Sequence, residues 1–218
     1  GSVRPCMPRR MLVAMQMEEF MTRRYELRFN RMKGCKEYRE RHSLFTDYRP
    51  VTAEAVKSIC FEAQLEGISA IEYDVQRYVD SRRVSHYWPI EEFLFDLPHW
   101  DGQDRIRALA DCVPCENKEW RDFFYIWFLS MVAHWLQMDR EHANSTSPLL
   151  VGPQGCRKSS FCQSLLPPEL RPYYVDGIDL GSRKDAEMAL NRFALINLDE
   201  FDSIPASRQP YLKNLLQK

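Results

Sequence analysis

Residues 148–161, PLLVGPQGCRKSSF, hold glycine, lysine and serine at a spacing that can bind phosphate. In the loop pattern G-x-x-x-x-G-K-[ST], backbone N–H groups cradle the phosphates, lysine reaches the β- and γ-phosphates, and the hydroxyl binds Mg²⁺. Gly152, Lys158 and Ser159 match the first glycine, the lysine and the hydroxyl. We therefore expect ATP and Mg²⁺ as ligands, with the nucleotide contacted by Gly152, Pro153, Gln154, Gly155, Cys156, Arg157, Lys158, Ser159 and Ser160.

Arg157 stands where the usual loop has its second glycine, and an additional glycine, Gly155, lies two positions earlier. With ordinary helical backbone angles, a side chain fits at position 157 without a penalty, and the guanidinium points outward or along the phosphates. With a positive φ, the arginine costs about 1–2 kcal/mol and lowers nucleotide affinity about tenfold. We predict that the loop binds phosphate, with Gly155 supplying the tight turn.

Two acids, Asp199 and Glu200, close the apolar segment FALINLDE at 193–200. Carboxylates at the carboxyl end of a parallel strand lie where ligands bind in α/β sheets. Asp199 is predicted to hold Mg²⁺ together with Ser159, and Glu200 to orient and deprotonate the water that attacks the γ-phosphate. The predicted catalytic residues are thus Lys158, Asp199 and Glu200, whereas a surface role is expected for Asp202.

From residue 147 onward, short apolar runs alternate with helical patterns, an order typical of a parallel α/β layer. Strands are expected at 149–151, 173–175 and 193–198, and helices over 159–166, over 184–191 and from 205. Before residue 147 we expect helices only, over 9–41, 52–65, 70–84, 90–97, 105–111 and 118–138. The predicted fold is therefore mixed, an all-helical N-terminal region followed by a parallel α/β P-loop NTPase domain that the chain leaves incomplete. Its expected parts are a basic helical leader at 1–47, a helical domain at 48–144 and the P-loop domain at 145–218.

The N-terminal segment is basic although the whole chain carries a formal net charge of −1. Residues 1–41 hold eleven Lys and Arg against five Asp and Glu, which leaves −7 for the remainder. Such a segment suggests DNA as a partner, although a solvated helix face fits the charge pattern equally well. On a continuous helix, Tyr25 and Phe29 could stack on bases but are better explained as a buried seam. The DNA contacts would come from one basic stripe formed by Arg23, Arg24, Arg28 and Arg31.

Composition excludes several other classes of protein. Hydrophobic residues at 44% and aromatic residues at 12% suffice for a core, so the chain is not disordered. The most apolar stretch, 123–136, is shorter than the ~20 residues of a membrane span and is predicted to be a buried core helix. Seven cysteines without a disulfide framework indicate reduced thiols in a cytoplasmic protein. A zinc site is not expected, because the C-x-x-C pair of Cys112 and Cys115 lacks a second pair, and His134 and His142 fit no finger spacing.

Three segments together, WPIEEFLFDLPHWDGQDRI at 88–106, GPQGCRKSSF and LINLDEFD, give the chain a family likeness. It resembles the virulence-associated protein E family (VapE or VirE), P-loop ATPases of phages and other mobile elements that are related to superfamily 3 primase–helicases. The more specific marker is Trp100-Asp101-Gly102 followed by Asp104-Arg105-Ile106, and the likeness covers about residues 48–218. It implies ATP-dependent motor or remodelling activity on DNA, in ring-shaped oligomers, during replication of the mobile element. By position, Lys158 and Ser159 match Walker A, and Asp199 and Glu200 match Walker B.

Two other functions remain open. Such ATPases normally continue with a sensor residue and an arginine finger, so a chain ending at residue 218 is expected to hydrolyse ATP weakly or not at all. One alternative is therefore a catalytically impaired P-loop module that serves DNA binding or oligomeric assembly. A small-molecule kinase ranks last, because its arginine-bearing lid would follow the present residues and a helical domain ahead of the loop does not suit it.

Overall fold

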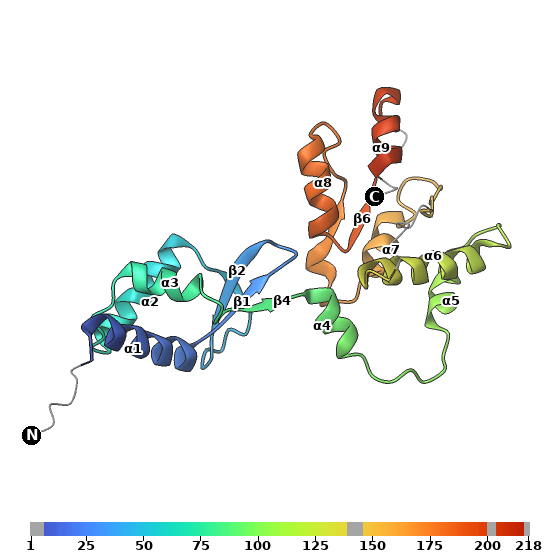
Figure 1. The fold of residues 1–218 in the computed structure, drawn as a ribbon. Coiled ribbons are helices and arrows are strands. Elements are labelled where there is room, and N and C mark those ends of the chain that lie inside the picture. The colour runs from blue at the N-terminus through green and yellow to red at the C-terminus, as the bar shows by residue number, and fades with distance from the viewer. Residues whose placement is uncertain (1–6, 139–145, 200–203, 216–218) are drawn as a thin grey trace, which may run out of the picture. The chain divides into compact units, whose positions relative to one another are not determined.

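The computed structural model describes residues 7–138, 146–199 and 204–215. Contacts divide the chain into two units, Gly1–Trp88 and Pro89–Lys218, each with its own helices and strands (Figure 1). We call them unit 1 and unit 2 and describe each by itself.

Unit 1 combines three helices with a four-stranded sheet (Figure 1). The sheet has the order β3-β2-β1-β4, in which β1 pairs with β2 antiparallel and with β4 parallel. In the hairpin register, Arg28 of β1 lies opposite Glu37 of β2. The elements in chain order are α1 (Arg9–Arg24), β1 (Tyr25–Asn30), β2 (Cys35–Glu40), β3 (Arg49–Pro50), α2 (Ala53–Leu65), α3 (Glu72–Val79) and β4 (Ser85–Tyr87).

The sheet corrects the prediction of an all-helical N-terminal region. The helix expected over 9–41 ends at Arg24, where the chain enters β1 directly, and the helix expected over 70–84 ends at Val79, before β4. Gly34 has φ +66°, a backbone region that glycine adopts readily, and this allows the turn between β1 and β2. The overlooked signal is a change of period: apolar residues recur at helical spacing in α1 but alternate with charged ones in YELRFN.

The core of unit 1 lies between its helices and the inner side of the hairpin. Phe20 and Met21 of α1 are almost completely buried together with Ile59 of α2 and Val75 of α3. Tyr25 joins them at 2% exposure, which confirms for this ring the prediction of a buried seam. The start of α2 follows the expected capping chemistry, since the Thr52 side chain accepts a hydrogen bond from the Ala55 N–H.

Unit 2 contains six helices and a pair of parallel strands among its described residues (Figure 1). The strands predicted near 173–175 and 193–198 are present as β5 and β6, paired through Tyr174 and Leu195 at the first position. No strand forms at 149–151, so the expected parallel layer is represented by these two strands. Two short 3-10 helices lie at Arg171–Tyr173 and Ala206–Arg208. The other elements are α4 (Pro89–Phe95), α5 (Arg105–Ala110), α6 (Trp120–Trp135), α7 (Lys158–Ser164), β5 (Tyr174–Asp176), α8 (Arg183–Arg192), β6 (Leu195–Asn197) and α9 (Gln209–Leu215).

Helix α6 packs against the elements that carry the glycine–lysine–serine loop motif and β6. Phe124 is 1% exposed and packs on Phe161 of α7, with 6.1 Å between ring centroids. The Trp135 Nε1–H donates to the carbonyl of Ala194, just ahead of β6, at 2.8 Å. The prediction of a buried core helix is only partly confirmed, because Phe123 and Ile126 on the other side of α6 are each 58% exposed. Within the described ranges, no helix is long and apolar enough to cross a membrane.

Candidate phosphate-binding loop

The loop between residue 152 and α7 turns sharply just before the helix begins. Gly155 has φ +79°, and the Cys156 N–H donates to the Pro153 carbonyl at 3.4 Å. Arg157 precedes the first helical residue with φ 66° and ψ 29°, and its carbonyl accepts from the Phe161 N–H at 3.0 Å. The prediction that Gly155 supplies a tight turn is consistent with this geometry.

The backbone at Arg157 decides between the two conformations considered from the sequence. Arg157 has left-handed rather than ordinary helical backbone angles. At a residue with a Cβ this conformation costs roughly 1–2 kcal/mol. Because the folded chain itself has this conformation, the strain lowers the free energy of unfolding. The tenfold loss of nucleotide affinity expected from a positive φ does not follow for a loop that already has this shape.

Lys158 folds back toward the start of the loop. Its Nζ donates to the carbonyls of Gly152 at 2.9 Å and Pro153 at 3.1 Å, and lies 3.6 Å from the Cys156 sulfur. A Cβ at position 152 would lie only 3.1 Å from the same sulfur. The absence of a side chain at Gly152 therefore lets the two ends of the loop approach closely. The ammonium group is thus held over the loop that the motif assigns to phosphate.

Ser159 and Asp199 meet although they are far apart in the sequence. The Ser159 hydroxyl lies 2.9 Å from Oδ2 of Asp199, which follows the end of β6. A hydroxyl and a carboxylate are oxygen ligands of the kind that Mg²⁺ prefers, so this pair fits the metal position that the motif implies. Glu200 and Asp202, the other acids singled out from the sequence, lie outside the described residues.

The described part of the chain holds no group of three or more His, Cys, Asp or Glu side chains placed to bind a metal. Mg²⁺ in nucleotide sites is bound by one or two protein groups together with phosphates and waters, so a pair suffices. Cys112 and Cys115 are exposed and form no disulfide. His142 lies outside the described residues.

A polar cluster at the carboxyl edge of the β5–β6 pair was not identified from the sequence. Asp176 ends β5 and accepts hydrogen bonds from the Tyr174 hydroxyl at 2.6 Å and from the Asn197 amide at 2.8 Å. Burial and the hydrogen bond to Asp176 raise the pKa of Tyr174. Burial, and then the charges of Asp176 and Asp199, raise the pKa of the Cys162 thiol on α7. The signal was present, since YYVD, like FALINLD, is an apolar run that ends in an acid.

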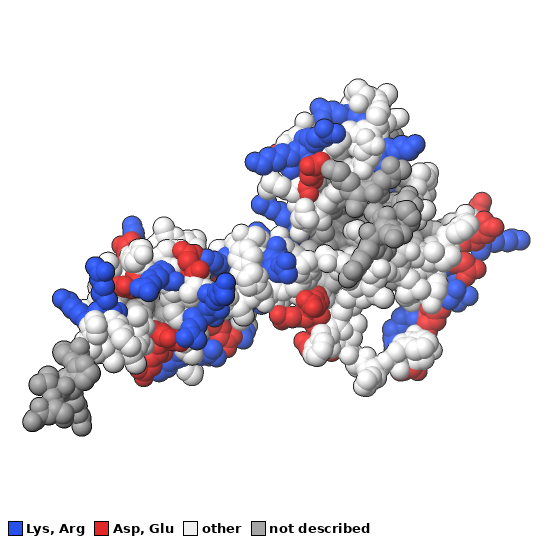
Figure 2. Space-filling model, viewed as in Figure 1, with Lys and Arg blue, Asp and Glu red and all other residues white. Residues whose placement is uncertain are grey.

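The four arginines predicted to form a DNA-binding stripe do not share a helix face. Arg23 and Arg24 end α1, Arg28 lies in β1 and Arg31 lies in the turn that follows. Arg23 pairs with Glu66, and Arg24 pairs with Glu62 at 2.8 Å and with Glu66 at 3.1 Å. On the visible face of unit 1, blue and red side chains are interspersed (Figure 2). The prediction of a continuous basic stripe is therefore wrong, because the helix that would create it ends at Arg24.

Arg28 belongs instead to a buried charge network on the hairpin. Its guanidinium carbon lies 3.6 Å from the ring centroids of Tyr48 and Tyr87, and its Nε donates to Glu37 at 3.0 Å. Glu37 is fully buried and also accepts from Lys33 at 2.9 Å and from Asn30 at 3.3 Å. Burial alone would raise the pKa of Glu37, but these hydrogen bonds outweigh it and lower the pKa.

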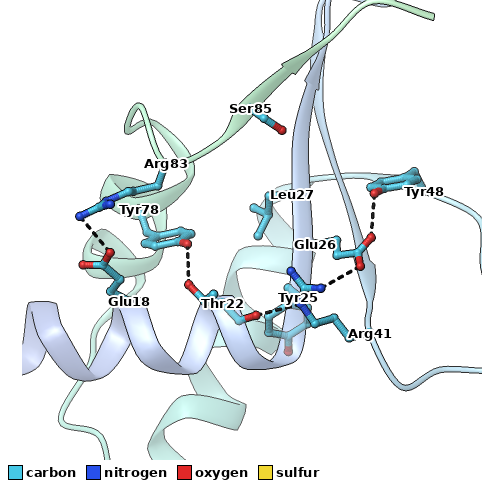
Figure 3. Close-up of a pocket in the computed structure, with 10 residues that line it drawn as sticks. All are labelled: Glu18, Thr22, Tyr25, Glu26, Leu27, Arg41, Tyr48, Tyr78, Arg83 and Ser85. Carbon is cyan, nitrogen blue, oxygen red and sulfur yellow. Dashed lines mark hydrogen bonds and ion pairs between the residues drawn. The ribbon is translucent and has the colours of Figure 1, made fainter. Parts of the chain in front are cut away.

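Unit 1 also contains a cavity of about 530 Å³ that the sequence did not suggest (Figure 3). Its two arginines are engaged: Arg83 pairs with Glu18 at 2.9 Å, and Arg41 pairs with Glu26 at 2.9 Å. Hydrogen bonding, chiefly from Arg39, lowers the pKa of Glu26. The lining is therefore balanced in charge and offers no cationic site for phosphate. The lining residues are Glu18, Thr22, Tyr25, Glu26, Leu27, Arg41, Tyr48, Tyr78, Arg83 and Ser85.

The family model of the virulence-associated protein E-like domain matches residues 94–218. The match covers more than half of the chain and includes both the loop and the Trp100-Asp101-Gly102 marker, so the chain belongs to this family. It is narrower than the 48–218 expected from the resemblance, and all of unit 1 lies ahead of it. No curated protein and no solved structure matches the chain.

Proposed function

We propose that this chain binds ATP with Mg²⁺ through its loop, as the nucleotide-binding part of a helicase-like or primase–helicase-like protein of a phage or mobile element. The contact of 2.9 Å between Ser159 Oγ and Asp199 Oδ2 is the observation that carries this proposal. It joins the hydroxyl of the loop motif to an acid at the end of a parallel strand, the two positions at which P-loop NTPases hold their metal. Membership of the virulence-associated protein E-like family supports the helicase-like assignment.

In the proposed mechanism, each side chain has one task. Lys158 exchanges the carbonyls of Gly152 and Pro153 for the β- and γ-phosphates, which offer it stronger, charge-assisted hydrogen bonds. Ser159 and Asp199 would hold Mg²⁺, and the bound ion would offset the negative charge that builds up on the phosphates. Glu200 is proposed from the sequence as the residue that orients and deprotonates the attacking water. Action on DNA is proposed from the basic N-terminal segment and the family resemblance, a ring-shaped oligomer from the resemblance alone, and a cytoplasmic location from the cysteine content.

A calorimetric titration of the 218-residue chain with ATP and Mg²⁺ tests the nucleotide site. We expect Lys158→Ala to weaken ATP binding about 10- to 100-fold, since hydrogen bonds to charged groups contribute ~1.5–3 kcal/mol. Lys184→Ala is the matched control, because Lys184 is an exposed lysine on α8 of the same unit. Absence of ATP binding by the unmodified chain would overturn the proposal, as would equal affinities of the two lysine variants.

Arg157 in place of the usual second glycine, together with the basic residues of the N-terminal segment, favours a second candidate, a catalytically impaired loop in a module for DNA binding or assembly. DNA binding would then persist in Lys158→Ala and weaken steeply with salt, because lysines and arginines release counterions from DNA. Arg31→Ala is the cleanest probe of the basic segment. In the described structure its guanidinium contacts only the Trp88 ring, at 4.5 Å, whereas Arg23, Arg24 and Arg28 hold carboxylates. Salt-insensitive or absent DNA binding would exclude this candidate.

A further inference from the structure

Asp176 connects the carboxyl ends of the two parallel strands of unit 2. It is the last residue of β5, and in the register of the pair it lies beside Asn197, the last residue of β6. One oxygen of its carboxylate, Oδ1, accepts from the Asn197 amide at 2.8 Å and from the Tyr174 hydroxyl at 2.6 Å. The main chain adds a further bond, since the Gly177 N–H donates to the Asn197 carbonyl at 2.6 Å. Asn197 is therefore held to the end of β5 by its side chain and by its backbone.

These polar groups lie on the side of the strands that faces α7. Side chains alternate along a strand, so Asn197 points to the same side as Leu195, two residues earlier in β6. Leu195 packs against the hydrophobic cluster that contains Leu165, at the end of α7. Asp176 lies on this side as well, because its carboxylate bonds the Asn197 amide. The bonded cluster thus lies beneath the helix whose first turn carries Ser159.

The cluster ends immediately ahead of the acid proposed to bind the metal. Only Leu198 separates Asn197 from Asp199, whose Oδ2 lies 2.9 Å from the Ser159 hydroxyl. The bonds of Asn197 are the last ones of the strand pair before Asp199 among the described residues. The position of the Asp199 carboxylate therefore depends on how firmly Asn197 is held.

We infer that Asp176 is a positioning residue for the proposed Mg²⁺ site, where it fixes through Asn197 the strand end that brings Asp199 to Ser159. This inference rests on the proposed nucleotide site and adds to it a residue to which the loop motif gives no role. Groups that orient metal ligands from outside typically contribute about 10- to 100-fold to metal affinity. Because Asp176 is exposed, water replaces part of its contribution, and the lower end of that range applies.

Calorimetric titrations with ATP, at a series of Mg²⁺ concentrations and without Mg²⁺, test this inference. In Asp176→Ala and in Asn197→Ala, we expect the Mg²⁺ concentration for half-maximal ATP binding to rise about tenfold. ATP binding without Mg²⁺ should change less than about threefold in either variant. Asp185→Ala is the matched control, because this exposed aspartate lies in the first turn of α8 in the same unit. Equal losses with and without Mg²⁺ would mean that Asp176 only stabilises the fold, and would overturn the inference.

A variant that exchanges the two partners separates the hydrogen bond from the charge of Asp176. Asn197→Ala already removes the bond without changing the net charge. The double variant Asp176→Asn with Asn197→Asp keeps the net charge and restores an amide–carboxylate bond in the reverse direction. We expect its dependence on Mg²⁺ to return to within about threefold of the unmodified chain. A folded exchange variant that binds Mg²⁺ and ATP no better than Asn197→Ala would contradict the positioning role.

The same titrations distinguish this inference from the proposed function. If the unmodified chain does not bind ATP, or binds it without dependence on Mg²⁺, the proposed site fails and the inference fails with it. If the unmodified chain shows Mg²⁺-dependent binding and both alanine variants match it, only the positioning role of Asp176 is overturned.

Discussion

Basic residues have different surroundings in unit 1 and in the phosphate-binding loop of unit 2. In unit 1, Arg24 and Arg28 are held by carboxylates, and Glu37, the partner of Arg28, is fully buried. In unit 2, Lys158 bonds backbone carbonyls of its own loop, and Arg157 extends into solvent without a described partner. Basic residues that look alike in the sequence are therefore structural in the first case and available to an anion in the second.

The strongest test of this contrast is removal of a buried partner in unit 1. Arg28→Ala leaves Glu37 buried with fewer donors, and we expect the free energy of unfolding to fall by about 3 kcal/mol. Arg23→Ala is the comparison, since this exposed pair with Glu66 should contribute less than about 1 kcal/mol. Urea unfolding of both variants gives the two values. Equal losses would remove the distinction between buried and surface arginines.

Asp199→Asn tests the opposite side of the comparison, the availability of the loop to a metal and an anion. Replacing the carboxylate keeps an oxygen near Ser159 but removes a charge from the proposed Mg²⁺ position. We expect ATP affinity in the presence of Mg²⁺ to fall about tenfold, the equivalent of ~1.4 kcal/mol. Titration without Mg²⁺ is the control, and there the variant should bind at least as well as the unmodified chain. A loss of equal size without the metal would contradict the role of Asp199.

The smallest expected effect is a pH dependence of unit 1. The folded protein lowers the pKa of Glu37 below its ordinary value, so the ionised carboxylate favours folding. This contribution is complete above the unfolded pKa of about 4.3 and is lost as the pH falls through the lower, folded pKa. Glu37→Gln should therefore flatten the dependence of unfolding free energy on pH below about 4.5. An unchanged slope between pH 5 and pH 3 would show that Glu37 does not contribute to it.

Several predictions that depend on neighbouring residues in the sequence were confirmed, whereas some that depend on contacts between distant residues failed. The Thr52 cap, the helix near 53–65 and the paired runs near 174 and 195 were predicted, because their signals lie within a few residues. The sheet of unit 1 was missed, since continuous helix was assumed past Arg24 although the spacing of apolar residues in the sequence changes there. A strand was predicted at 149–151 from apolar residues alone, and pairing, which a strand also requires, is absent among the described residues.

By itself the sequence determined which groups could meet a phosphate, because Gly152, Lys158 and Ser159 lie within one short segment and act through local backbone geometry. It also indicated Asp199, since an acid at the end of an apolar run is a local feature. Only the tertiary structure decided that Arg24 and Arg28 form ion pairs with carboxylates and that Arg157, among the described residues, does not. The physical reason is distance along the chain, because Glu62 contacts Arg24 only after the chain has folded back. The pattern of charges in the sequence does not show which distant residues will meet in this way.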